Sequence, residues 1–252
     1  MTQITSQQNP GLKALRRLHT RRERARRGAF AVEGEDLVAA AERAGRTPLE
    51  GYRLAGSGLG GEGFHDVDAP ALASVSTLGS STRVIAVYEQ LWSEPVGPLC
   101  LYLHGVGDPG NVGTVLRSAL AFGASSVTLG PGCADPHSPK AVRASMGAIF
   151  AVRIARVAGP AGLPGERIAL VAGTGEPLRG PAGDGAEGGE GADAPPVTLL
   201  VGAERDGLPA DVVAACERVA SIPIASESLN AAMAATVALY EMTRRPSRVP
   251  AS

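Results

Sequence analysis

Short apolar runs alternate with segments of helical periodicity along the second part of the chain. The segment 112–122 carries apolar residues on one helical face, and it lies between two apolar runs of strand length. The strands that we expect in this part are 99–103, 126–129, 151–154, 168–173 and 197–201. Such alternation is typical of a mostly parallel sheet with helices on its faces. We therefore predict an α/β fold, with one domain over residues 98–252.

The first part of the chain predicts a smaller α/β domain, over residues 1–93. A charged stretch, 6–27, is compatible with helix and carries Leu12, Leu15 and Leu18 at a spacing of three. It is followed by apolar runs of strand length and a further helical segment, at 30–32, 36–44, 52–54 and 84–88. Proline and glycine residues at 94–98 then separate the two domains.

Glycine, proline and acidic residues dominate one segment of the larger domain, 175–196. A segment of this composition cannot bury a core face. We therefore predict a flexible insertion in a surface loop.

The charge of the chain is unevenly distributed. Lys and Arg number 24 and Asp and Glu 25, so the whole chain is almost neutral. Residues 1–30, however, hold eight basic residues and one acidic residue. This imbalance predicts an anionic partner that binds at this end of the chain.

Several classes of protein are disfavoured by the same sequence. No run of about 18 apolar residues occurs, so no membrane span is predicted. The first ten residues are polar and predict no secretory signal. Three dispersed cysteines and four histidines lack the spacing of a disulfide framework or a metal site. We expect a cytoplasmic, metal-free protein.

Asn111 directly precedes the predicted helix 112–122, and Arg117 lies within it. Asn111 stands where an N-cap residue is expected, and Arg117 lies off the apolar stripe. A glycine-rich turn joins this helix to the preceding strand. Both side chains are therefore expected near the carboxyl edge of the sheet, where open α/β folds bind ligands. An ordinary capped helix with a solvated arginine explains these residues equally well.

The C-terminal part contains a second group of polar residues between apolar segments. Residues 199–209 indicate a buried strand, a turn and a helix that starts at a proline. The segment 222–230 leads to a helix over 231–243 that is apolar on all sides, so we expect it to be buried all round. A plain core helix is the alternative interpretation.

Residues 56–61 match the dinucleotide fingerprint G-x-G-x-x-G letter by letter. A functional fingerprint requires a helix that opens after its last glycine, and residues 62–66 have no helical period. We therefore interpret this segment as a flexible turn. The missing helix disfavours a nicotinamide-dependent oxidoreductase.

Three motifs, in their order along the chain, resemble those of the SpoU–TrmH class of RNA ribose 2′-O-methyltransferases, in the SPOUT superfamily. They are Asn111-x-Gly113-x-x-x-Arg117, Gly202-x-Glu204-x-x-Gly207, and Ile222-Pro223-Ile224 leading to Ser228-Leu229-Asn230. The segment 135–147 is similar to the family's stretch between the first two motifs. Residues 9–13 and 28–34 are similar to its ribosomal-protein-like RNA-binding extension. The resemblance covers almost the whole chain.

This resemblance implies a reaction in which S-adenosylmethionine (SAM) donates a methyl group to a ribose 2′-hydroxyl of structured RNA, with rRNA favoured over tRNA. It also implies a homodimer and a C-terminal trefoil knot that forms the SAM pocket. A catalytically inactive RNA-binding protein of the same fold is the alternative, which the intact polar residues of the motifs disfavour.

The resemblance also implies roles for individual residues. The catalytic residues would be Asn111, Arg117, Glu204, Ser228 and Asn230, and the cofactor-binding residues Thr174, Gly202, Ile222, Ile224 and Leu229. Because arginine stays protonated at neutral pH, we assign Arg117 to holding the RNA phosphate and stabilising the developing alkoxide, not to accepting the proton. Asn111, Ser228 and Asn230 would orient Arg117 and the ribose. Glu204 would fix Arg117 or neighbouring backbone donors, or else be a surface acid in a turn.

The basic residues near the N-terminus form the predicted RNA-facing patch: Lys13, Arg16, Arg17, Arg21, Arg22, Arg24, Arg26 and Arg27. A single acidic residue, Glu23, lies among them, so we expect most of these side chains to be unpaired and to contact phosphates. A solvated helical face is the alternative interpretation.

Overall fold

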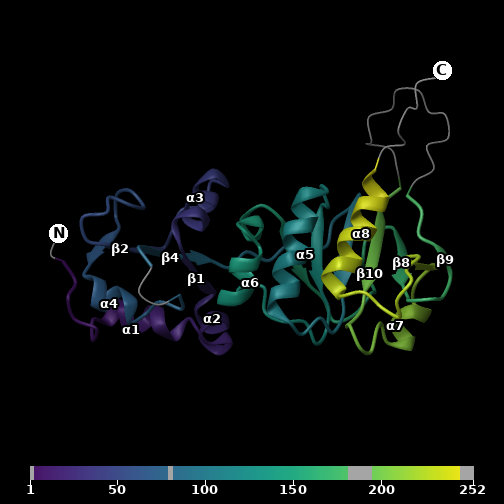
Figure 1. Ribbon diagram of the computed structural model, residues 1–252, viewed down its shortest axis with the longest axis horizontal. Coiled ribbons are helices and arrows are strands. Elements are labelled where there is room, and N and C mark those ends of the chain that lie inside the picture. Colours follow the sequence, from purple (N-terminus) through teal and green to yellow (C-terminus); the bar gives the residue numbers. More distant parts are fainter. Residues whose placement is uncertain (1–2, 79–81, 181–194, 245–252) are drawn as a thin grey trace, which may run out of the picture. The chain divides into compact units, whose positions relative to one another are not determined.

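A computed structural model describes residues 3–78, 82–180 and 195–244 of the chain (Figure 1). The residues fall into two units. The first unit comprises Met1–Leu91, Val112–Arg117 and Ala134–Ala151, and the second comprises Trp92–Asn111, Ser118–Cys133 and Val152–Ser252. Each unit is described by itself below. The domain boundaries that the sequence suggests, at 93 and 98, stay a prediction.

The first unit is built around a four-stranded sheet in the order β1-β4-β2-β3. Its strands are β1 (Ala29–Glu33), β2 (Glu50–Leu54), β3 (His65–Val67) and β4 (Val84–Glu89). Strand β4 pairs antiparallel with β1 and β2, and β2 pairs parallel with β3. The helices of this unit are α1 (Pro10–Arg17), α2 (Arg21–Arg27), α3 (Glu35–Arg43), α4 (Ala69–Ala73) and α6 (Pro139–Ala144).

Helix α1 packs on the core of the first unit through its leucines. Asn9 caps its N-terminus by accepting hydrogen bonds from two backbone amides, and Pro10 is its first residue. Leu12 and Leu15 are fully buried, and Leu18 is 1 % exposed. These three leucines join one hydrophobic cluster with residues of the sheet and of α4. The three leucines at a spacing of three therefore lie on the buried side of this segment.

The second unit contains a seven-stranded sheet in the order β7-β6-β5-β10-β8-β11-β9. All its strand pairs are parallel. The strands are β5 (Leu99–Leu103), β6 (Ser126–Leu129), β7 (Arg153–Arg156), β8 (Glu166–Leu170), β9 (Glu176–Pro177), β10 (Val197–Val201) and β11 (Arg218–Ser221). The α/β fold with a parallel sheet, predicted from the alternation of apolar runs and helical segments, is confirmed.

Helices α7 (Ala210–Ala214) and α8 (Ala231–Thr243) accompany this sheet, together with the two ends of α5 (Pro109–Ala121). The middle of α5, Val112–Arg117, belongs to the first unit. Helix α8 lies beside β10 (Figure 1) and is tied to the end of α5 by a 2.6 Å hydrogen bond between the hydroxyls of Ser118 and Thr236. Within the described residues, no helix is long and apolar enough to cross a membrane. Nor do the described side chains include a group of three metal-ligating residues.

The expectation that the helix 231–243 is buried all round is wrong for the single chain. Ala235, Ala238 and Leu239 are fully buried. On another face, Met233 is 62 % exposed, Val237 41 % and Tyr240 54 %. An apolar helix can therefore still present one open face, which composition alone does not reveal.

The segment predicted as a flexible insertion is ordered at its start. Glu176 and Pro177 form β9, which pairs with β11, and the backbone amide of Leu178 donates a 2.7 Å hydrogen bond to the carbonyl of Ser221. Leu178 is also buried. The prediction of flexibility is wrong for these residues, because neighbouring backbone groups satisfy their hydrogen bonds. Residues 181–194 of the segment lie outside the described residues.

Candidate functional site

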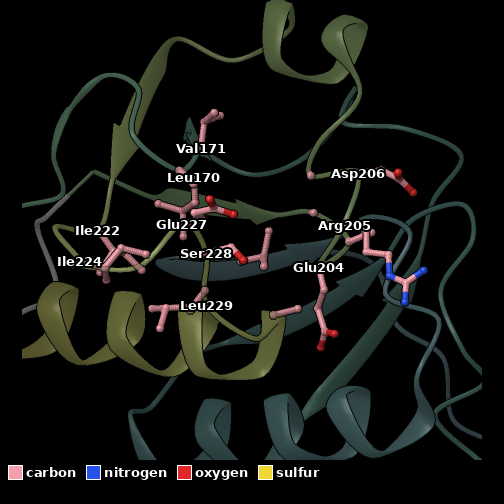
Figure 2. Close-up of a pocket in the computed structure, with 17 residues that line it drawn as sticks. Leu170, Val171, Glu204, Arg205, Asp206, Ile222, Ile224, Glu227, Ser228 and Leu229 are labelled. Atoms are coloured by element: carbon pink, nitrogen blue, oxygen red, sulfur yellow. The ribbon is translucent and has the colours of Figure 1, made fainter.

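A pocket of about 420 Å³ opens in the second unit, at the carboxyl ends of β8 and β10 (Figure 2). Its walls are mostly apolar side chains: Leu170, Val171, Ile222, Ile224 and Leu229. The remaining lining comes mainly from the turn 202–207 after β10 and from the segment that leads into α8. Parallel α/β sheets bind ligands at this edge, so the pocket lies where the fold predicts a site.

Two glycines shape the turn after β10. The backbone groups of Ala203 and Gly207 exchange two hydrogen bonds, of 3.1 and 3.0 Å. Gly207 has a φ of +65°, which favours glycine. A Cβ atom on Gly202 would lie 2.1 Å from the carbonyl carbon of Gly207, so no side chain fits there. The glycine spacing of this motif therefore forms a tight turn, with Glu204, Arg205 and Asp206 at its tip.

Helix α5 begins earlier than the sequence suggested. The side chain of Asp108 caps it by accepting a 3.0 Å hydrogen bond from the backbone amide of Asn111, and Pro109 is the first residue. The N-cap assignment of Asn111 is therefore wrong, because the Asp-Pro pair starts the helix. As a result, the Asn111 side chain is not used for capping.

Asn111, Glu204 and Asn230 form a hydrogen-bonded cluster, although the two asparagines are 119 positions apart. One carboxylate oxygen of Glu204 accepts hydrogen bonds from the side-chain amide nitrogens of both asparagines, each 2.5 Å long. The Asn230 nitrogen also donates to the side-chain oxygen of Asn111, at 3.2 Å. One residue from each of the three motifs thus meets at this point.

The cap of α8 fixes the orientation of the Asn230 amide. Its side-chain oxygen accepts from the backbone amides of Ala232 and Met233, at 3.0 and 3.3 Å. Because the oxygen is held by the helix, the nitrogen is turned toward Glu204. Glu204 is therefore part of a polar network and not an isolated surface acid in a turn.

The predicted cofactor-binding residues are placed around the pocket, with one exception. Gly202, Ile222, Ile224 and Leu229 line it, and so does Ser228, which was assigned a catalytic role. Thr174 is not among the described residues that line the pocket, so its assignment to the cofactor site is corrected. It is exposed, and its hydroxyl donates to the carbonyl of Ala172 at 3.5 Å. The chain turns at Gly173, whose φ is +65°, and so leads Thr174 toward β9.

Arg117 lies on α5 but on a different face from Asn111. Six residues separate them, which corresponds to about 9 Å along a helix axis and about 120° around it. The Arg117 side chain is exposed, and its guanidinium has no hydrogen-bond partner among the described residues. In a single chain, Arg117 is therefore available to an external group on the face of α5 that also exposes Thr114 and Leu120.

Arg24 does not belong to an exposed basic patch, which corrects the sequence-based assignment. It is 3 % exposed, and two of its nitrogens donate to one oxygen of Asp135, at 2.9 and 2.7 Å. Its remaining nitrogen donates to the carbonyls of Leu18 and His19, at 2.8 and 2.9 Å. Burial alone would raise the pKa of Asp135. Hydrogen bonds from His137 and Arg24 outweigh that effect and hold this pKa well below its usual range.

Three other basic residues of the predicted patch have partners within the first unit. Arg16 donates to Ser74, Arg26 to Glu23 and Arg27 to Glu50. The four that remain are exposed, and their side chains make no hydrogen bond or ion pair among the described residues: Lys13, Arg17, Arg21 and Arg22. The basic surface of α1 and α2 is therefore narrower than the charge count indicated.

The sequence analysis did not single out Glu227, which also lines the pocket. The available signal was its position, directly before Ser228 in the third motif. Leu170 and Val171 were not singled out either, because the end of an apolar strand does not show which residues face a ligand.

Comparison with known proteins identifies the family to which the chain belongs. The family model described as "SpoU rRNA Methylase family" matches residues 98–240, and the model "MRM3-like substrate binding domain" matches residues 9–55. The chain belongs to the SpoU rRNA methylase family. All three sequence motifs fall within the part that the SpoU model matches.

Individual relatives of this SpoU-family protein differ in how much they share with it. The 23S rRNA (guanosine(2553)-2′-O)-methyltransferase RlmP of Bacillus subtilis is 28% identical over 96% of this chain and 99% of its own length. An uncharacterized tRNA/rRNA methyltransferase of Synechocystis is 34% identical over 57% of this chain, and the match spans only 58% of that relative. The crystal structure of the AdoMet-bound rRNA methyltransferase from Sinorhizobium meliloti has a TM-score of 0.79 and 29% identity, and covers 95% of this chain and 96% of that one. AdoMet is SAM.

Proposed function

We propose that this protein transfers a methyl group from SAM to a ribose 2′-hydroxyl of rRNA. The observation that carries the proposal is the pocket at the carboxyl edge of the parallel sheet, which adjoins the cluster of Asn111, Glu204 and Asn230. Membership of the SpoU rRNA methylase family supports it. The relative from Bacillus subtilis, which matches nearly end to end, carries a 2′-O-methyltransferase name.

The pocket suits the adenosine part of SAM. Apolar side chains such as Leu170, Ile222 and Leu229 offer surfaces against which an aromatic base packs. Gly202 adds no side chain to the pocket, and the turn needs glycine there because a Cβ atom would collide with Gly207. Bound SAM supplies an electrophilic methyl group on a sulfonium. The chain must then hold the ribose oxygen in line with that methyl group and stabilise the oxygen as it loses its proton.

The cluster of Asn111, Glu204 and Asn230 positions the ribose oxygen. Glu204 holds the side-chain nitrogens of Asn111 and Asn230, so both amides have a fixed orientation before RNA binds. Ser228 lines the pocket two residues before Asn230 and contributes a hydroxyl beside them. Arg117 remains protonated and acts as a charged clamp on the RNA phosphate, with the proton leaving to a phosphate oxygen or to water.

A second copy of the chain covers the open face of α8. Met233, Val237 and Tyr240 form an apolar stripe on this helix, and Leu120 on α5 is 49 % exposed. Phe122 and Tyr240 are in edge-to-face contact with their ring centroids 6.1 Å apart, which joins the ends of the two helices. A stripe of this kind is unusual on a monomeric protein and typical of a subunit interface. The homodimer implied by the family resemblance therefore uses α5 and α8.

The sedimentation mass of the purified protein tests the dimer. We expect twice the mass of the chain, and we expect Val237→Glu to yield the mass of one chain, because a charge in an apolar interface is costly to bury. Leu49→Glu is the control, since Leu49 is also an exposed aliphatic residue, at 57 % against 41 % for Val237, and it belongs to the first unit. A monomeric wild-type protein, or a dimer unaffected by Val237→Glu, would contradict the proposed interface.

The C-terminal trefoil knot is part of the same proposal. It is supported by the course of the segment 222–230, which leaves β11, lines the pocket with the loops after β8 and β10, and enters α8. A knotted segment of this kind holds the three motifs together without any covalent cross-link.

The first unit supplies RNA contacts through Lys13, Arg17, Arg21 and Arg22. Replacing all four by glutamine is expected to weaken rRNA binding and to flatten the slope of log affinity against log salt by about two to four, since each phosphate contact contributes about −0.7 to −0.9. SAM affinity is expected to stay unchanged, because the pocket is built from residues of the second unit. Filter binding across a salt series measures the slope.

Arg43 and Arg83 provide a matched control for charge loss. Both are arginines of the first unit outside α1 and α2, and Arg83 pairs with Glu35 on the surface. Their replacement by glutamine should leave the slope unchanged. If the fourfold variant keeps the wild-type slope, α1 and α2 do not contact phosphates.

Calorimetric titration with SAM tests the pocket itself. We expect one site per chain, and we expect Gly202→Val to abolish it, because the added side chain would occupy the turn. Binding that survives in a folded Gly202→Val protein would place the SAM site elsewhere.

A further inference from the structure

Three carboxylates line the pocket, and they differ in their surroundings. Glu204 is held by the two asparagine amides. In Figure 2 its carboxylate is directed toward the helices below the pocket, and that of Asp206 is directed outward. The carboxylate of Glu227 lies over the middle of the pocket, between Leu170 and Ser228.

The Glu227 carboxylate has no hydrogen bond or ion pair with any described residue. The basic residue that lines the pocket is Arg205, and Figure 2 shows its guanidinium directed away from Glu227. The walls next to Glu227 are apolar, at Leu170, Val171 and Leu229. Glu227 is exposed in the open pocket, and a carboxylate whose charge no described protein cation compensates favours a cationic ligand.

We propose that Glu227 faces the sulfonium of the cofactor and makes the pocket prefer SAM over its demethylated product, S-adenosylhomocysteine. The inference rests on the proposed function. Its chemical basis is a change in charge: methyl transfer breaks the bond between the methyl carbon and sulfur, the bonding pair stays on sulfur, and the sulfonium becomes a neutral thioether. The attraction to Glu227 is lost with that charge, so the product binds less tightly than the substrate.

The position of Glu227 in the chain indicates that it faces the sulfonium of the cofactor and not its ammonium group. Glu227 precedes Ser228 directly and Asn230 by three residues. Asn230 belongs to the cluster that holds the ribose oxygen. The attacked methyl group must lie within about 3.5 Å of that oxygen. The end of the pocket next to these residues is therefore the end that receives the sulfonium.

Calorimetric affinities for SAM and S-adenosylhomocysteine test the inference. Glu227→Gln is expected to weaken SAM binding by about two- to fivefold, the range for a partly exposed charge pair, and to leave S-adenosylhomocysteine binding unchanged. In the wild type the preference for SAM should shrink as salt is raised, and in the variant it should be insensitive to salt. In steady-state kinetics, KM for SAM should rise and kcat should not fall, since the attraction to the sulfonium weakens as its charge is lost during transfer.

Two controls separate this role from general effects of charge. Asp206→Asn removes a carboxylate that lines the pocket but points outward, and Glu176→Gln removes an exposed one on β9. Neither should change the ratio of the two affinities.

The possible outcomes are distinct. Equal weakening of both ligands by Glu227→Gln would place the carboxylate at the ammonium group and overturn the inference. An unchanged ratio in a variant that binds both ligands normally would do so too. Failure of the wild-type protein to bind SAM at all would instead refute the proposed function.

Discussion

Arg117→Ala should abolish methyl transfer while leaving the affinity for SAM within about threefold of wild type. Arg117 is exposed on α5, on a different helical face from Asn111, and it contributes nothing to the lining of the pocket. A charged group that stabilises a developing oxyanion is worth about 10²- to 10³-fold in rate, and the loss of the phosphate contact adds to that. Single-turnover methylation with labelled SAM measures the rate, and calorimetry measures the affinity.

Two further variants test whether the effect of Arg117→Ala is specific to the guanidinium group. Ala121→Ser changes an exposed residue about one turn later on α5 and should be nearly silent. Arg117→Lys retains the charge without the planar fork, so it should restore part of the rate. If SAM binding were lost together with activity in Arg117→Ala, the arginine would belong to the cofactor site and the assignment to the RNA side would be wrong.

Glu204→Ala should lower the rate of methyl transfer by about 10²- to 10³-fold, because the side-chain nitrogens of Asn111 and Asn230 lose the acceptor that orients them. The affinity for SAM should change little, since the apolar walls and Gly202 remain in place. Glu204→Gln should be impaired as well, because a neutral amide oxygen accepts the two hydrogen bonds more weakly than a charged carboxylate oxygen does. The rate is again measured in single turnover.

A double-mutant cycle then shows whether the cluster acts as a unit. Adding Asn111→Ala to Glu204→Ala should cost far less than the sum of the two single effects, as expected for groups that work together. Asp206→Asn, on the same turn, serves as the control. Additive losses would show that Glu204 does not act through Asn111.

Some of this structure could be predicted from local patterns. Apolar runs of strand length gave the parallel sheet, because strands buried on both faces contain continuous apolar residues. Leu12, Leu15 and Leu18, at a spacing of three in a stretch predicted to be compatible with helix, are all buried in the structure. The sequence locates the glycines of the second motif but does not show why glycine is needed there. The reason is that a Cβ atom on Gly202 would collide with Gly207, and this depends on the path of the turn.

Contacts between distant residues could not be predicted in this way. Arg24 belongs to a run of basic residues, and only the fold shows that Asp135, 111 positions away, neutralises it in the interior. The cluster of Asn111, Glu204 and Asn230 is likewise formed across the sheet edge. Motif order indicated that these three belong together, but the hydrogen bonds that join them depend on the cap of α8 and on the Asp108 cap that leaves Asn111 available.

The most direct test of the central claim is the chemical position of the transferred methyl group. Unmodified rRNA is incubated with the protein and methyl-labelled SAM, and the product is hydrolysed in alkali. Cleavage by alkali needs a free 2′-hydroxyl, so a nucleotide methylated at that oxygen stays joined to its neighbour. We predict that the label is recovered in alkali-resistant dinucleotides and that Arg117→Ala yields none. Label recovered in single nucleotides would show methylation of a base and would contradict the account, as would the absence of transfer by a wild-type protein that binds both SAM and RNA.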